Sequence, residues 1–180
     1  MSIAVSVKGP TLALRRVVPA DATYVHGLRI NPAYSQHLSP VTGTVEDQRR
    51  WIDGYKGREA VGAEYYFVIE CLNGTPCGTV RLYDITPAHF TWGSWILDAN
   101  KPPKAALESA ILSFGFGFCS LGLSEAHVDV RVANTHAERF YRRLGMQETH
   151  RTYQDIYFVY SRACFDANYA SYMTILEQKV

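Results

Sequence analysis

The segment Asn134–Met146 constrains the fold more than any other part of the chain. It follows a β-like run at residues 126–132. Asn134 can cap a helix through its side-chain oxygen, and Gly145 can end that helix in a left-handed conformation. Apolar positions recur between them at spacings of three and four, which predicts one buried helix face made of Ala137, Phe140, Tyr141 and Leu144. The segment therefore predicts a strand, a capped helix and a glycine stop in immediate succession.

The composition predicts one globular domain, residues 1–180, because 47% of the 180 residues are hydrophobic and 19% are charged. The formal net charge of +1 gives no electrostatic basis for binding nucleic acid. No stretch is long and apolar enough to cross a membrane, and residues 1–8 lack the pattern of a secretion signal. We therefore expect a cytoplasmic protein that binds neither nucleic acid nor membrane.

The four cysteines show no spacing typical of a metal site, and no histidine lies near them in a zinc-like pattern: Cys71, Cys77, Cys119 and Cys164. We interpret them as reduced thiols, mostly in the core, which agrees with a cytoplasmic location. The sequence predicts no bound metal.

Apolar patterns predict an α+β fold with strands and helices in mixed order. Strands are expected at residues 11–18, 65–71, 77–83, 90–97, 126–132 and 155–160, with 147–153 as a candidate partner of the last. Helices are expected at residues 22–29, 44–55, 105–121 and 134–144, with 165–180 as a helical appendage at the C-terminal end. Asn73 and Gly74 predict a hairpin turn. On the expected strand 90–97, Trp92 and Trp95 are predicted to point to opposite faces.

The pattern of Asn134–Met146 resembles the last motif of the GCN5-related N-acetyltransferases, the GNAT family. The resemblance implies a mixed, mostly antiparallel sheet of six to seven strands flanked by helices. It also implies that two central strands, 90–97 and 126–132, splay apart and that acetyl-CoA lies in the opening. The expected partners are this cosubstrate and a small-molecule amine acceptor, and the chain is expected to be a monomer or a homodimer.

In this family a glycine-rich loop before the central helix holds the pyrophosphate of CoA, because free N–H groups at a helix start attract anions. The matching window here is Lys101–Ala106, in which Lys104 replaces the glycine and two prolines follow Lys101. Side-chain charge can compensate for the lost glycine, or the loop can be degenerate. The resemblance places these residues at the cofactor: Ile96, Leu97, Lys101, Lys104, Ala105, Ala106 and Asn134.

Tyr141 matches the position where the family often has a tyrosine near the thioether sulfur, and a phenol there can return a proton to the leaving thiolate. A buried tyrosine that only packs under the cofactor is the alternative. No general base stands out in the sequence, and the candidates are Glu70, Asp84, His89, Ser94 and Asp98.

The loop between the first helices, residues 27–38, is expected to select the acceptor. Its pattern of arginine, proline, serine and glutamine resembles acetyltransferases that modify nucleotide-linked 4-amino sugars, as in pseudaminic-acid synthesis. A looser similarity connects it to acetyltransferases of ribosomal-protein N-termini. The residues expected to contact the acceptor are Arg29, Tyr34 and Gln36.

Three hypotheses follow from these patterns. The first is an N-acetyltransferase that moves acetyl from acetyl-CoA to the primary amine of a small molecule, with a nucleotide-linked amino sugar as the leading candidate. The second is an acetyltransferase of protein N-termini. The third is a non-catalytic binding module that kept the fold after its phosphate loop degenerated.

Overall fold

The computed structural model describes residues 6–178, and one mixed sheet of eight strands forms its centre. The strand order is β1-β2-β3-β4-β5-β6-β8-β7, and every pair of neighbours is antiparallel except β5 and β6. The strands are β1 (Ser6–Lys8), β2 (Leu12–Arg16), β3 (Tyr65–Cys71), β4 (Pro76–Tyr83), β5 (His89–Leu97), β6 (Glu125–Arg131), β7 (Gln147–Arg151) and β8 (Asp155–Ser161). The expected α+β class and the mostly antiparallel sheet are confirmed.

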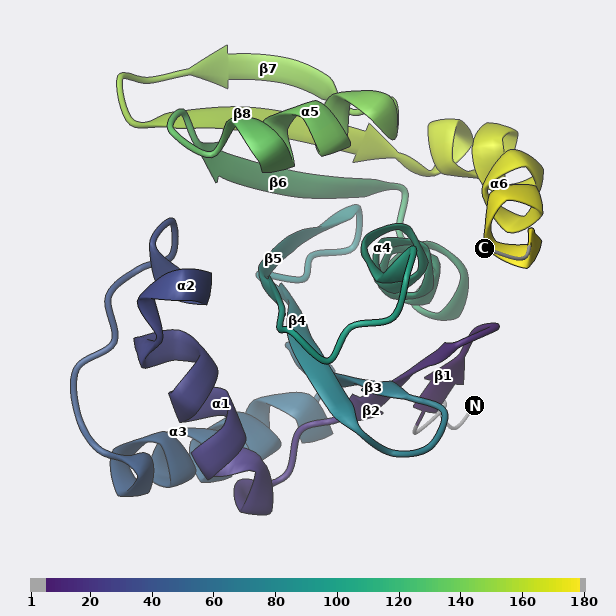
Figure 1. Cartoon of the computed structure of the whole chain (residues 1–180). Helices are drawn as coiled ribbons and strands as arrows, with labels where there is room; N and C mark the ends of the chain where they lie inside the picture. Colours follow the sequence, from purple (N-terminus) through teal and green to yellow (C-terminus); the bar gives the residue numbers. More distant parts are fainter. Residues whose placement is uncertain (1–5, 179–180) are drawn as a thin grey trace.

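Helices cover the sheet, with α1, α2 and α3 grouped away from α4, and with α5 lying along β6 and β8 (Figure 1). The helices are α1 (Ala22–Ile30), α2 (Pro32–Ser35), α3 (Val45–Ala60), α4 (Ala105–Gly115), α5 (Thr135–Arg143) and α6 (Arg162–Glu177). The sequence did not predict β1 or α2, because three or four residues are too few to show a period.

Alternate side chains of β3 enter two different cores. Phe67 and Ile69 belong to the larger core, which includes α4, whereas Tyr66 and Val68 pack with α1 and α3. Because successive side chains of a strand point to opposite faces, the two cores lie on opposite faces of the sheet. The faces are called the α4 face and the α1/α3 face below.

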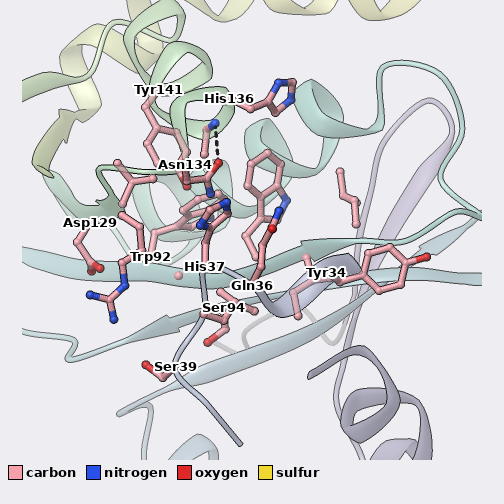
Figure 2. Close-up of a pocket in the computed structure, with 18 of the residues that line it drawn as sticks. Tyr34, Gln36, His37, Ser39, Trp92, Ser94, Asp129, Asn134, His136 and Tyr141 are labelled. Atoms are coloured by element: carbon pink, nitrogen blue, oxygen red, sulfur yellow. Dashed lines mark hydrogen bonds between the residues drawn. The ribbon is translucent and has the colours of Figure 1, made fainter. Parts of the chain in front are cut away.

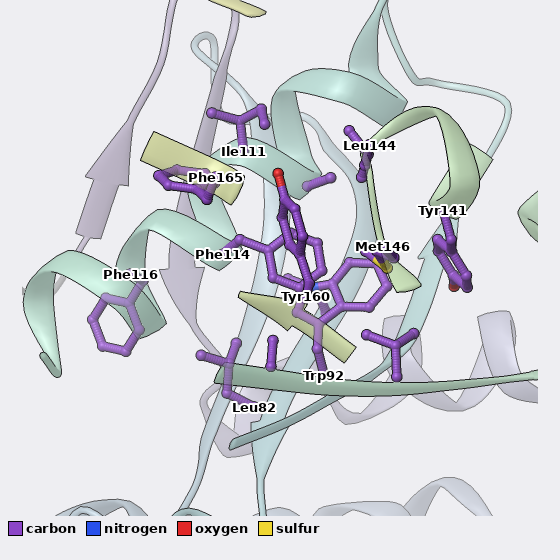
Figure 3. Close-up of a cluster of buried hydrophobic side chains, with 14 of the residues drawn as sticks. Leu82, Trp92, Ile111, Phe114, Phe116, Tyr141, Leu144, Met146, Tyr160 and Phe165 are labelled. Carbon is purple, nitrogen blue, oxygen red and sulfur yellow. The ribbon is translucent and has the colours of Figure 1, made fainter. Parts of the chain in front are cut away.

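Aromatic rings fill the larger core under α4 (Figure 3). Trp92 stacks on Phe114 with a centroid separation of 4.7 Å, and Tyr160 meets Phe114 edge to face at 5.1 Å. Offset and edge-to-face contacts of this kind are the favoured arrangements of aromatic pairs. They anchor β5 and β8 to the same helix.

A β-bulge in β5 overturns one prediction. Thr79 and Arg81 of β4 pair with Ile96 and Gly93 of β5, so β5 contains one extra residue there, and Ser94 adopts a left-handed φ of 49°. The Nε1 groups of Trp92 and Trp95 donate to Ser113 and Ser109, two residues of α4. Both indoles therefore point to the α4 face, and the predicted alternation is wrong because the extra residue resets it.

Strands β5 and β6 separate soon after they begin. They pair in parallel only from His89 to Thr91 on β5 and from Glu125 to His127 on β6. Their remaining residues have no mutual pairing in the part of the chain that the structure describes. The expected splay of two central strands is confirmed.

The ends of α5 form as the sequence predicts. The Asn134 side chain accepts a hydrogen bond of 3.2 Å from the Ala137 amide. Gly145 has a φ of 89°, its amide donates to Arg142 O, and the Met146 amide donates to Tyr141 O. These two bonds form a Schellman motif.

The predicted helix at residues 105–121 forms, with its last turn, Phe116–Ser120, widened to π-helical geometry. Gly117 makes this path possible, because a Cβ there would lie 2.3 Å from the Phe90 ring.

Helix α6 begins at Arg162, slightly before the predicted start, and the final residues 179–180 lie outside the described part of the chain. Phe165 is buried in the larger core. The Tyr172 hydroxyl donates a hydrogen bond of 2.9 Å to Leu144 O, at the C-terminal end of α5. Helix α6 therefore contacts the C-terminal end of α5 and helps to hold it in place.

Candidate active site

A cavity of about 450 Å³ opens where β5 and β6 diverge. Its walls come from the splayed halves of both strands, the start of α5, the loop before α4, and the segment from α1 to Ser39 (Figure 2). Nearly all the predicted site residues line it: Arg29, Tyr34, Gln36, Ile96, Leu97, Lys101, Ala106, Asn134 and Tyr141. Lys104 and Ala105 are not in its wall.

The cavity passes through the sheet from one face to the other. Ala137 and Tyr141 belong to the larger core and mark the α4 face. Val128 and Val130 also enter that core, so Asp129 between them points to the α1/α3 face. One opening therefore faces the start of α4, and the other faces the loop after α1.

Tyr141 lines the cavity and is only 6% exposed, with its ring edge to face against Trp92 at 6.0 Å. No hydrogen bond joins its hydroxyl to any of residues 6–178. Burial, and then the charge of Asp129, raise the pKa of this hydroxyl above the ordinary tyrosine value. The group therefore stays protonated at neutral pH and can donate to a ligand.

Lys104 keeps the backbone conformation of the glycine that it replaces. Its φ of 63° is left-handed, and it is the N-cap of α4. Its Nζ donates to the carbonyl oxygens of Ile175 and Gln178 at the end of α6, so its charge is directed away from the cavity. Ala105 is buried behind it in the larger core.

At the start of α4 the Ala105 amide donates to Pro102 O at 3.2 Å, and the amides of Ala106 and Leu107 have no hydrogen-bond partner within residues 6–178. Lys104 makes no side-chain capping bond, and the first intrahelical bond runs from the Glu108 amide to Lys104 O. Helix starts of this kind attract anions through their free N–H groups and dipole. Lys101 lines the cavity nearby and adds positive charge.

Two tyrosines hold the loop before α4 from the α1/α3 side. The Tyr24 hydroxyl of α1 donates a hydrogen bond of 2.7 Å to Oδ2 of Asp98, which is buried. The Asp98 Oδ1 atom accepts from the Asn100 amide at 2.7 Å. Tyr34 of α2 accepts from the Ala99 amide at 3.3 Å through its hydroxyl oxygen. These hydrogen bonds hold the loop before α4 in place, although the loop lacks a glycine-rich sequence.

The segment after α1 borders the opening of the cavity on the α1/α3 face, which is called the outer opening below. Asn31 caps α2 by accepting from the Ala33 amide at 3.0 Å, and the Arg29 Nη2 group approaches Ser39 O at 3.4 Å. Arg29, Tyr34 and Gln36 all line the cavity, and their contact with the acceptor stays a prediction.

Two carboxylates of the cavity are absent from the residues predicted from the sequence. Asp129 and Asp155 line it, and Asp155 forms an ion pair of 3.1 Å with Arg131. The alternation of residues 126–132 carried the missed signal, because it places Asp129 and Arg131 on the face away from the valines. The pairing of Arg131 with Asp155 could not be predicted from local patterns, because Asp155 lies on β8, a separate strand.

Of the candidate bases named from sequence, only Ser94 lies in the cavity wall. Asp98 is engaged by Tyr24, and Glu70 pairs with Arg15 at 3.1 Å. His89 stacks on His127 with a centroid separation of 4.1 Å. No group of three or more His, Cys, Asp and Glu side chains that could hold a metal occurs within residues 6–178.

Comparisons with known proteins agree with this geometry. The sequence profile of the acetyltransferase (GNAT) domain matches residues 11–147. The chain belongs to the GNAT family. It is therefore an N-acetyltransferase that uses acetyl-CoA as its acetyl donor and acts on an amine acceptor.

Among solved structures, this GNAT enzyme is similar to FdhC in its apo form, which is described as a nucleotide-linked sugar GNAT. The two share 37% identity over 93% of this chain and 96% of FdhC, with a TM-score of 0.86. No match was found among curated protein sequences.

Two more distant structures share the fold alone. Ribosomal-protein-S5-alanine acetyltransferase from Vibrio fischeri is 15% identical over 88% of this chain and 97% of its own, with a TM-score of 0.74. A variant of spermidine N-acetyltransferase from Vibrio cholerae is 20% identical over 87% of this chain and 97% of its own, with a TM-score of 0.71. No helix within residues 6–178 is long and apolar enough to span a membrane.

The residues at the splay fit acetyl-CoA. The uncapped start of α4 and Lys101 suit a pyrophosphate, and the unpaired edge of β5 beyond Thr91 suits a chain that carries amide groups. The Tyr141 hydroxyl, which has no partner in the described chain, suits the reacting end of the thioester.

Proposed function

We propose that this GNAT enzyme acetylates the primary amine of a nucleotide-linked amino sugar. The observation that carries the proposal is the wall made by Arg29, Tyr34 and Gln36 at the outer opening of the cavity. Arginine can bind phosphate oxygens in a two-pronged geometry, and a tyrosine ring offers a surface for a base or sugar. The 37% identity with FdhC, a nucleotide-linked sugar GNAT, supports the same acceptor class.

The donor enters from the α4 face. Acetyl-CoA supplies the acetyl thioester. Ile96 and Leu97 of β5 offer backbone groups to the pantetheine chain, Lys101 and Ala106 border the pyrophosphate, and Asn134 lies beside the thioester end. Lys104 contributes to donor binding through its backbone at the start of α4, because its side chain is directed to α6. Ala105 contributes through the same first turn.

The acceptor enters from the α1/α3 face, and the two substrates meet inside the sheet. The acceptor nitrogen attacks the thioester carbonyl directly, with no acetylated side chain between. Tyr141 donates its proton to the departing thiolate, because its hydroxyl is protonated at neutral pH and has no competing partner in the described chain. A cytoplasmic location stays a prediction.

The test is release of CoA thiol from acetyl-CoA with three acceptors: a UDP-linked 4-amino sugar, spermidine, and a peptide with N-terminal alanine. We expect the nucleotide sugar to give the highest kcat/KM. Arg29→Lys, which keeps the charge but loses the planar fork, should raise KM for that acceptor about tenfold and leave the affinity for CoA unchanged. A higher kcat/KM for the peptide or the polyamine would contradict the proposal.

A further inference from the structure

A carboxylate that forms no ion pair within the described part of the chain lines the cavity on its proposed acceptor side. Asp129 lies in the splayed part of β6 and faces the α1/α3 side. Its neighbour Asp155 is neutralised by Arg131 at 3.1 Å. Asp129 forms no ion pair with any of residues 6–178, so its charge is free for a ligand.

Side chains from three elements converge around Asp129. Burial raises the pKa of the Tyr83 hydroxyl of β4 and of the Tyr141 hydroxyl of α5, and the charge of Asp129 raises both pKa values further. All three side chains line the cavity (Figure 2 labels Asp129 and Tyr141). Asp129 therefore lies close to the proposed acid, on the other face of the sheet.

The second independent observation is the Tyr141 hydroxyl itself. The residue is more than nine-tenths buried, lines the same cavity and has no hydrogen-bond partner within the described chain. The Tyr141 hydroxyl and the Asp129 carboxylate therefore line one cavity from opposite faces of the sheet, and the carboxylate forms no ion pair within residues 6–178. Proton transfer to the sulfur needs a donor such as the hydroxyl, and binding of an ammonium group needs a carboxylate.

We propose that Asp129 binds the ammonium group of the acceptor and removes its first proton. The inference deepens the proposed function and rests on it for the direction from which the acceptor enters. One proton passes from nitrogen to the Asp129 carboxylate and then to solvent, and the nitrogen lone pair forms the C–N bond. The C–S bond breaks, the thiolate takes the Tyr141 proton, and the nitrogen loses its second proton, which balances the one that Tyr141 gave. The products are the amide, the CoA thiol and one released proton.

The pKa of Asp129 suits this role. Burial, and then the nearby Asp155, raise the pKa of its carboxyl above the ordinary aspartate value, while Arg131 opposes the shift. The other ionisable groups in the cavity wall are Arg29, Tyr34, His37, Lys101 and His136. A base with a raised pKa takes up a proton more readily.

The test compares Asp129→Asn with Glu125→Gln. Glu125 lies on the same strand and the same face, about 13 Å away by strand geometry, and outside the cavity wall. Thiol release is measured with ethylamine, which is too small to need the acceptor loop, and with a UDP-linked 4-amino sugar. Asp129→Asn should lower kcat/KM roughly 100-fold at pH 7 with both amines. The defect should shrink as pH rises and more of the amine is neutral, while Glu125→Gln matches the wild type.

Calorimetry with CoA should give the same Kd for Asp129→Asn and the wild type, which separates a catalytic loss from a folding defect. An Asp129→Asn variant with wild-type kcat/KM and an unchanged pH profile would overturn the inference. If ethylamine reacts with this dependence on Asp129 and the nucleotide sugar does not react, the proposed acceptor is wrong and the role of Asp129 stands.

A third measurement decides the case in which neither amine reacts. With aspartate labelled with 13C at the carboxyl carbon, the Asp129 resonance is identified by its loss in Asp129→Asn. In the complex with CoA, added ethylammonium should shift this resonance at pH 7. A resonance that ethylammonium leaves in place would also overturn the inference.

Discussion

The Tyr24 hydroxyl of α1 donates a hydrogen bond of 2.7 Å to Oδ2 of Asp98, at the beginning of the loop that leads to α4. The other oxygen of the same carboxylate orders the turn by accepting from the Asn100 amide. This contact joins α1 to the loop that leads to α4. It explains how a loop with two prolines and no glycine keeps a defined path.

Loss of this contact should weaken donor binding. In Tyr24→Phe, the buried Asp98 loses a hydrogen bond while the ring still packs, so the loop should loosen and the Kd for CoA should rise about fivefold. Calorimetry with CoA measures the change. Tyr153→Phe removes a hydroxyl from a fully solvated tyrosine, 89% exposed, and should leave the Kd as it is. An unchanged Kd in Tyr24→Phe would show that the loop does not depend on this contact.

Lys104 should matter more for stability than for binding phosphate. Lys104→Ala loses the bonds to the end of α6 and keeps the left-handed strain, so Tm should fall by roughly 3 to 6 °C. Lys104→Gly relieves the strain, so its Tm should fall less than that of Lys104→Ala. Lys101→Ala, in contrast, should raise the Kd for CoA about fivefold with little change in Tm. Calorimetry and thermal melts check this. A larger rise in the Kd for CoA in Lys104→Ala than in Lys101→Ala would show that Lys104 binds the phosphate.

Removal of the Tyr141 hydroxyl should affect turnover alone. Tyr141→Phe keeps the ring contact with Trp92 and the helix packing, so the Kd for CoA should change less than twofold. Because the thiolate would have to take its proton from water, kcat should fall roughly 100-fold. Steady-state kinetics of thiol release measures this. A variant with wild-type kcat would reduce Tyr141 to a packing role.

Glu148 should give the fold one identifiable acid sensitivity. Ion pairs with Arg151 and Arg142 lower the pKa of its carboxyl from 4.5 to about 2. A lowered folded-state pKa means that the ion pairs stabilise the protein fully above about pH 4.5, and that this contribution is lost as pH falls toward 2. Glu148→Gln should therefore melt roughly 1 to 2 °C lower at pH 7 and equal the wild type near pH 2. Melts from pH 7 to pH 2 check this, and a constant difference across the range would contradict it.

The β5 bulge shows where sequence reasoning reached its limit. A two-residue period puts Trp92 and Trp95 on opposite faces, yet both indoles donate to serines of α4. Gly93, directly before Ser94, is the one local signal of the extra residue, because an isolated glycine in a strand pattern indicates a bulge. The left-handed conformation of Ser94 itself appears only in the pairing of β4 with β5. One inserted residue therefore changed which side chains line the cavity.

The sequence by itself determined the features that depend on neighbours a few residues apart. The Asn134 cap, the Gly145 stop and the Asn73–Gly74 turn form as predicted, because each needs only one side chain or one flexible backbone position within a single turn. Arg29, Tyr34 and Gln36 could be expected in one cavity for the same reason, since a single short segment carries them.

Only the tertiary structure decided the features that depend on distant partners. The side chain of Lys104 reaches the end of α6, and Arg131 pairs with Asp155 of another strand, so Asp129 has no ion pair among residues 6–178. Charge neutralisation and burial depend on which groups meet in space, and local propensity does not specify that. The sequence therefore determined the family and its helix, and the packed sheet decided which charges face the reacting groups.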